Sequence, residues 1–123
     1  MTIRTILAID AVTCAAMGIG LVAAAHSLSG LLGLPQDLLS AAGWLLLPIA
    51  VFMAALAWQA QPWRAGVWVI ILGNLAWVIA SIAVLFLTTP NALGAGFLAA
   101  QALVVALLAL AETRAVRNRP LPA

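Results

Sequence analysis

The stretch from Gly66 to Leu87 constrains the fold of this chain more than any other part of the sequence. It carries no charged residue, and about 20 apolar residues in a helix span the ~30 Å hydrocarbon core of a bilayer. The whole chain is 67% hydrophobic and 7% charged, whereas a soluble domain carries about 25% charged residues. We therefore expect an integral membrane protein.

One face of this stretch combines small, polar and aromatic residues. At helical spacing this face contains Gly66, Ile70, Gly73, Asn74, Trp77, Ser81 and Val84. An asparagine in lipid needs a hydrogen-bonding partner, so we expect this face to contact other helices.

Three further apolar stretches are long enough to cross a bilayer. We expect helices at about 3–26, 38–58, 63–87 and 92–113, joined by an apolar interfacial loop at 27–37 and by two short turns. Short connections place consecutive helices antiparallel. The sequence thus predicts an all-α fold, a single transmembrane domain 1–123 built as an antiparallel four-helix bundle. A cleaved signal peptide is the alternative for the first stretch, but Asp10 interrupts it.

The arginines predict the orientation in the membrane. With four crossings, all of them fall on one side, whereas Asp37 lies on the other: Arg4, Arg64, Arg114, Arg117 and Arg119. The positive-inside rule then places both termini in the cytoplasm. Nucleic acid is not an expected partner, because these few basic residues are tied to segment ends.

A weak internal repeat relates the second and fourth stretches. Residues 43–57 run parallel to residues 96–110, and each follows a proline-containing turn. This pattern raises the hypothesis of two duplicated helical hairpins. Chance is the alternative, because helices rich in alanine and leucine resemble one another.

Small residues indicate where helices approach closely. They recur at steps of three and four in the first stretch (Ala8, Ala11, Ala15, Gly18) and in the fourth (Ala95, Ala99, Ala102, Ala106, Ala109). In lipid, close packing replaces the hydrophobic effect as the force that joins helices. A tightly packed bundle is expected.

Asp10 is interpreted as the only acid well inside a helix. Asn74 lies at a similar depth, so the two side chains are expected to hydrogen-bond. A proton or cation site is the functional hypothesis. The alternative is a structural acid that reaches the interface or pairs with Arg4 or Arg64.

Gln101 and Ser81 share a depth near the bilayer centre, so we expect a hydrogen bond between them, with a ligand site as the alternative. The intramembrane polar or ligand-binding candidates are therefore Asp10, Asn74, Trp77, Ser81 and Gln101.

No catalytic or metal-binding pattern is found. The sequence shows no nucleophile–base pair, paired carboxylates or phosphate loop, and no Cys/His/Asp/Glu cluster for zinc. Cys14 is expected to be a small buried residue. His26 is expected at the interface, with pigment or haem ligation as the alternative. No cofactor is expected, and an enzyme is the least favoured class.

The run Gly73-Asn74-x-x-Trp77-Val78-x-x-Ser81 resembles one found in small, uncharacterised bacterial inner-membrane proteins of four helices. That resemblance implies a four-helix fold in a bacterial inner membrane, and it brings no known activity with it. In size the chain also resembles the small multidrug resistance transporters, in which Asp10 would match an essential acid of the first helix. It departs from them because that acid is a glutamate lying deeper in the helix, and because here the arginines lie on one side.

Two main hypotheses follow. The first is a non-catalytic membrane protein, acting as an accessory or scaffold subunit or binding a small apolar ligand between its helices. The second is a small proton-coupled transporter that uses Asp10. The expected partners are the lipid bilayer and either a second copy of the chain or a larger membrane complex.

Overall fold

A computed structural model describes residues 2–122 as five α-helices, with no strand in that range. They are α1 (Ile3–Ala23), α2 (Ala25–Leu32), α3 (Gln36–Trp58), α4 (Arg64–Leu87) and α5 (Ala92–Asn118). All except α2 are long and apolar enough to cross a membrane. The all-α class and the presence of four helices long and apolar enough to span a membrane were therefore predicted correctly.

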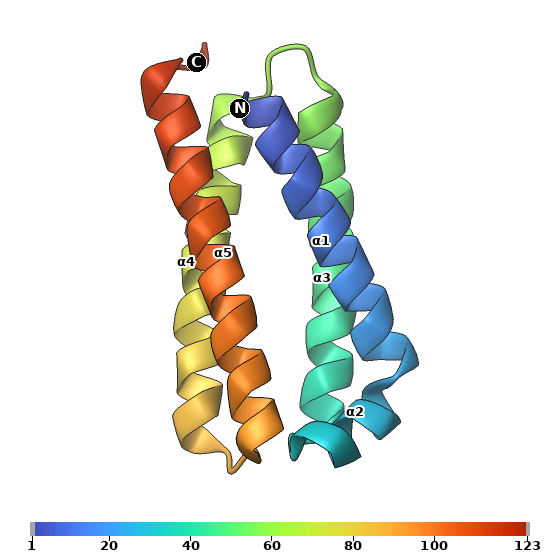
Figure 1. Ribbon diagram of the computed structural model, residues 1–123. Helices are drawn as coiled ribbons and strands as arrows, with labels where there is room; N and C mark the ends of the chain where they lie inside the picture. The colour runs from blue at the N-terminus through green and yellow to red at the C-terminus, as the bar shows by residue number, and fades with distance from the viewer. Residues whose placement is uncertain (1, 123) are drawn as a thin grey trace.

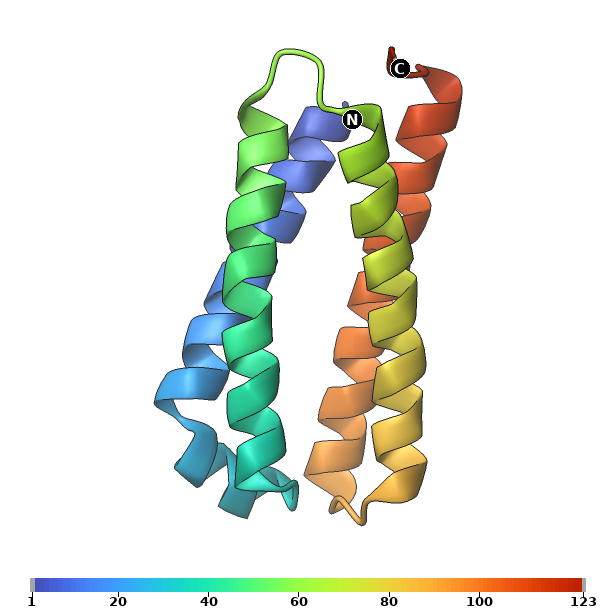
Figure 2. The same ribbon diagram turned by 180° about the vertical axis from the view of Figure 1, so that it is seen from behind.

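The long helices associate as two side-by-side pairs. α1 packs most extensively with α3, and α4 with α5, whereas α3 and α4 touch only slightly. Figures 1 and 2 show both termini and the α3–α4 connection at one end of the molecule. α2 and the α4–α5 turn lie at the other end.

The expected first helix at 3–26 and loop at 27–37 were wrong. α1 ends at Ala23, because Ala24 leaves the helical conformation with φ −117° and ψ 20°. The chain then forms α2, which ends at Gly33 in the left-handed conformation that glycine adopts readily (φ 69°). Pro35 is the N-cap residue of α3, and Gly30 lies inside α2.

The last helix extends beyond the predicted end at 113. α5 continues to Asn118, because Val116 is buried against the core and keeps the final turns packed. Arg117 in the last turn also interacts favourably with the helix dipole. Pro48 lies within α3, which continues through it from Gln36 to Trp58.

The small-residue stripes were only partly right. In α1 and α3, Gly18 and Gly43 lie at the contact: a Cβ on Gly43 would stand 2.8 Å from the carbonyl oxygen of Gly18. In α5, Ala102 and Ala109 are buried, but Ala99 is exposed. Alanines spaced alternately four and three residues apart therefore do not all lie on the face of α5 that contacts its neighbours.

A polar contact ties the two helix pairs together at the α2 end. The Asn91 side chain donates to the carbonyl oxygen of Leu31 (2.8 Å), and its backbone N–H donates to that of Leu32 (3.2 Å). Its side-chain oxygen also caps α5 by accepting from the N–H of Gly94 (2.8 Å). One residue thus starts α5 and holds it against α2.

The glycine contact between α1 and α3 yields the first prediction. Gly43→Ala should lower the free energy of unfolding by about 1–3 kcal/mol, because the added methyl group would stand 2.8 Å from the backbone oxygen of Gly18, which cannot rotate away as the end of a flexible side chain could. Gly20→Ala is the control: its Cβ meets nothing within 4 Å, so the gain in helix propensity, up to about 1 kcal/mol, should remain. Thermal unfolding in detergent measures both, and equal melting temperatures would refute the close-contact argument.

Candidate functional site

A buried polar cluster joins α1, α4 and α5. The amide nitrogen of Asn74 donates to Asp10 Oδ2 (2.9 Å) and to Glu112 Oε1 (2.8 Å). Asp10 and Glu112 are 1% and 0% exposed, and Asn74 is also buried. The predicted hydrogen bond between Asp10 and Asn74 is confirmed, and it is half of a bridge between two carboxyl groups.

Glu112 corrects two expectations. Asp10 is not the only acid buried inside a helix, and the protein does contain a pair of neighbouring carboxyl groups. Sequence reasoning missed Glu112 because it comes just before Arg114, where the helix was expected to end. Helical phase was the available signal. Glu112 lies three residues after Ala109 and four before Val116, both of which are buried.

Asp10 and Glu112 would repel each other if both carboxyl groups were charged. At an effective dielectric constant of about 20, two unit charges about 5 Å apart repel by about 3 kcal/mol. The alternative of a pairing between Asp10 and Arg4 is not seen, since the Arg4 side chain donates from Nε to the carbonyl oxygen of Ala57 (3.0 Å). The nearest further polar group is Cys14, whose thiol donates weakly to Asp10 Oδ1 (3.6 Å). Arg64, the other candidate partner, is exposed.

A second polar cluster lies within the α4–α5 pair. Trp77 Nε1 donates to Gln101 Oε1 (2.7 Å), and Gln101 Nε2 donates to Ser81 Oγ (2.7 Å). Ser81 in turn donates to the carbonyl oxygen of Trp77 (2.8 Å). The expected bond between Gln101 and Ser81 is confirmed. These polar atoms satisfy one another, so the cluster presents mainly carbon to its surroundings.

Two cavities lie between the helix pairs, and the five predicted residues line them. The outer cavity, of about 290 Å³, has Trp77, Ser81 and Gln101 in its wall. The inner cavity, of about 170 Å³, has Asp10, Asn74 and Trp77. Met17 and Trp77 line both cavities and mark where they adjoin. Together the two cavities form the interhelical groove.

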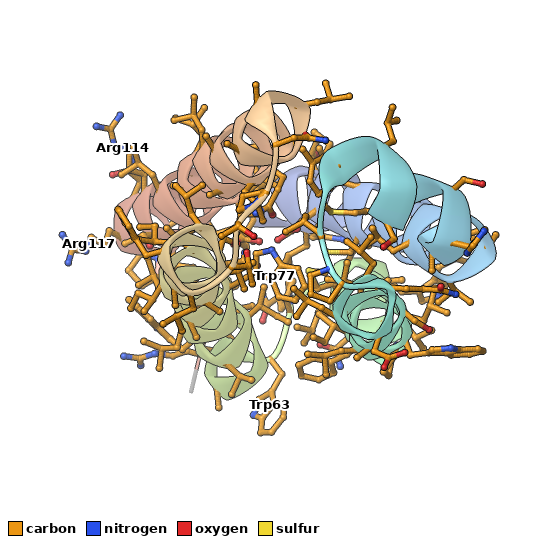
Figure 3. All side chains as sticks on the ribbon, turned by 90° about the horizontal axis from the view of Figure 1, so that it is seen from below. Trp63, Trp77, Arg114 and Arg117 are labelled. Carbon is orange, nitrogen blue, oxygen red and sulfur yellow. The ribbon has the colours of Figure 1, made fainter. Side chains whose placement is uncertain are left out.

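A view along the helices from below supports this placement. In Figure 3 Trp77 points into the space between the helices, whereas Arg114 and Arg117 point away from it. Gly73 borders the inner cavity, and a Cβ there would meet nothing within 4 Å. Its predicted role in helix packing was therefore wrong.

Within residues 2–122, no three His, Cys, Asp or Glu side chains gather as a metal ion would require. His26 is exposed, and its Nδ1 lies 3.3 Å from Gln36 Oε1. A larger hollow of about 1070 Å³ opens at the end that holds the termini. It borders Arg4 and Arg119 and none of the predicted site residues.

No protein-family model, curated protein or solved structure matches this chain.

The Asn74 bridge yields the second prediction. Asn74→Leu should destabilise the protein by about 2–3 kcal/mol, because two buried carboxyl groups lose their donor at once. Ser81→Ala should cost less than about 1 kcal/mol, as typical single interhelical hydrogen bonds do. Unfolding in detergent compares them, and a loss for Asn74→Leu no larger than that for Ser81→Ala would contradict the bridge.

Proposed function

We propose that this chain is a multi-pass protein of the bacterial inner membrane that holds one hydrocarbon chain in its interhelical groove. It would act as an accessory protein and not as an enzyme. The observation that carries the proposal is the groove itself, which is apolar, lies between two helix pairs and is bordered by all five predicted polar residues.

The surface of the long helices supports the membrane assignment. Large apolar side chains are exposed on all four of them, including Val12 (69%), Val51 (70%), Ile79 (68%) and Leu103 (61%). In water a surface of this kind would drive aggregation, whereas lipid tails cover it without cost. With the arginines at the end that holds the termini, we place that end in the cytoplasm and the four long helices as an antiparallel transmembrane bundle.

The pairing of helices also bears on the proposed duplication. Each pair, α1 with α3 and α4 with α5, is a unit that a duplicated hairpin would produce. The first glycines of the two repeats differ in environment: Gly43 is packed against α1, whereas Gly96 meets nothing within 4 Å. If the hairpins are duplicates, the close glycine contact between helices is therefore kept in the α1–α3 pair and not at Gly96.

The chemistry of the groove favours an apolar occupant. Trp77, Ser81 and Gln101 form hydrogen bonds with one another. Other residues in the wall of the outer cavity, such as Met17 and Phe97, are apolar. A polar ligand would find few unpaired groups there. Small-molecule sites are mostly apolar and often lie between the helices of a bundle. A volume of about 290 Å³ suits one flexible chain.

A proton-coupled transporter that uses Asp10 is the second candidate function. It is favoured by one observation, the complete burial of Asp10 beside a second acid. Acidic groups that are buried in membrane helices often belong to proton pathways.

The orientation yields the third prediction. Reporter fusions after Ala123 and at Gln36 should report opposite compartments, with the first in the cytoplasm, because all five arginines follow the positive-inside rule. Alkaline phosphatase and green fluorescent protein fusions measure this. The same compartment for both sites would overturn the four-crossing topology.

The groove yields the fourth prediction. A photoreactive fatty acid should label Met17 in membranes, and Ala80→Phe should reduce that labelling several-fold by filling the outer cavity, which Ala80 borders. Ala76→Phe is the matched control, since Ala76 lies one turn earlier on α4, is exposed and borders neither cavity.

Peptide mass spectrometry reads the labelling at Met17 relative to Val51, which faces outward and should be labelled equally in all three proteins. Equal labelling of Met17 in the two variants, or none in the parent, would refute the groove as a binding site.

A further inference from the structure

The hydrogen-bond donors around the two buried acids are too few. A side-chain amide has two N–H donors, and Asn74 gives one to each carboxyl group. No second donor from this residue remains. Glu112 Oε2 is buried and has no hydrogen-bonding partner, and Glu112 as a whole is 0% exposed.

The same shortage holds for Asp10. Its Oδ2 accepts from Asn74, but its Oδ1 has only the weak thiol donor of Cys14 at 3.6 Å. Two full carboxylates in this position would leave one buried oxygen without a donor and a second with only a poor one. Protonation of one carboxyl group supplies a new O–H donor and removes one of the two negative charges.

We propose that Asp10 and Glu112 form one proton-binding site, in which the two carboxyl groups hold a single proton between them. In the binding step one carboxylate oxygen accepts a proton from water, an O–H bond forms, and the charge of the pair changes from −2 to −1. Asp10 also borders the inner cavity, but this proposal does not require a ligand in the groove.

A proton fits these residues better than a metal ion. Hard cations such as Ca²⁺ take six to eight oxygen ligands, and Mg²⁺ takes six. Within the described range, Asp10 and Glu112 are not joined by a third acidic, histidine or cysteine residue in a group that would hold a metal ion. A proton needs only the oxygens that the two carboxyl groups already provide.

The surroundings contain few other charges. α1 contributes Cys14 and Arg4, whose guanidinium is directed to Ala57. α4 contributes Asn74, with Arg64 exposed at its start, and α3 contributes apolar residues of the core around Met53. The arginines that follow Glu112 along the chain are exposed: Arg114, Arg117 and Arg119. Hence none of the described residues places a cation within the cluster to neutralise both carboxylates.

Infrared spectroscopy of the full chain in lipid nanodiscs tests this inference. At pH 7 the parent should show the C=O stretching band of about one protonated carboxyl group per chain. Asp10→Asn should abolish the band, because the amide replaces the charge that holds the proton and adds a donor for Glu112. Glu112→Gln should also abolish the band, because the amide replaces the second carboxyl charge and adds a donor for Asp10.

Asp37→Asn is the control, because it removes the only other acid, an exposed residue outside the cluster. It should leave the band unchanged. A band that persists in Asp10→Asn would mean that Glu112 holds its proton alone, and absence of the band in the parent would mean that both acids are charged. Either result overturns the proposal.

A second measurement needs no variant and so does not depend on mutant folding. Either the aspartates or the glutamate are labelled with ¹³C at the carboxyl carbon. Glutamate labelling reports on Glu112 alone, because it is the only glutamate in the sequence. For a proton shared by the pair, either label should shift the protonated-carboxyl band. A shift with one label alone assigns the proton to one residue and refutes sharing.

Discussion

The amide of Asn74 is the contact on which the arrangement of this protein depends. The α1–α3 and α4–α5 pairs are each held by extensive helix packing, but α3 and α4 barely touch. Asn74 reaches from α4 to Asp10 on α1 and to Glu112 on α5. In a bilayer, apolar surfaces gain little from leaving lipid for one another, so polar contacts carry more of the specificity of association. At the α2 end, Asn91 makes the other polar link between the pairs through Leu31 and Leu32.

This division explains why the interhelical groove exists. Close packing needs small residues on both helices, as at the contact of Gly18 with Gly43. Across the boundary between the pairs, a similar close contact occurs near the termini, where a Cβ on Gly66 of α4 would stand 2.9 Å from the Leu56 side chain of α3. Residues of all four long helices share a core cluster with Leu56 there. At Gly73, two turns further along α4, a Cβ would meet nothing within 4 Å, so the pairs leave space between them. The cavities lined by Met17 and Trp77 are the consequence.

Much of this architecture could be predicted from the sequence, and the failures have physical causes. Four uninterrupted apolar stretches define the spans because the bilayer sets their length, and Asp10 with Asn74 followed from shared depth. α2 was missed because an apolar segment with two glycines gives no periodic signal long enough to distinguish a short helix from an interfacial loop. Glu112 was missed because charge near a helix end was taken as the edge of the membrane. Its phase with Ala109 and Val116 would have placed it inward.

Asp10 has a place in both parts of the structure. It borders the inner cavity, and it belongs to the carboxyl pair that Asn74 bridges. The charge on the pair therefore sets the electrostatic potential at one wall of the groove, while the outer cavity, lined by Phe97 and Leu21, stays apolar at any charge. A groove that is uniformly apolar would distinguish ligands only by size. Because one end of this groove carries an ionisable side chain, the affinity for an occupant that reaches Asp10 depends on whether the carboxyl pair holds a proton. By linkage, such an occupant changes the proton affinity of the pair by the same factor.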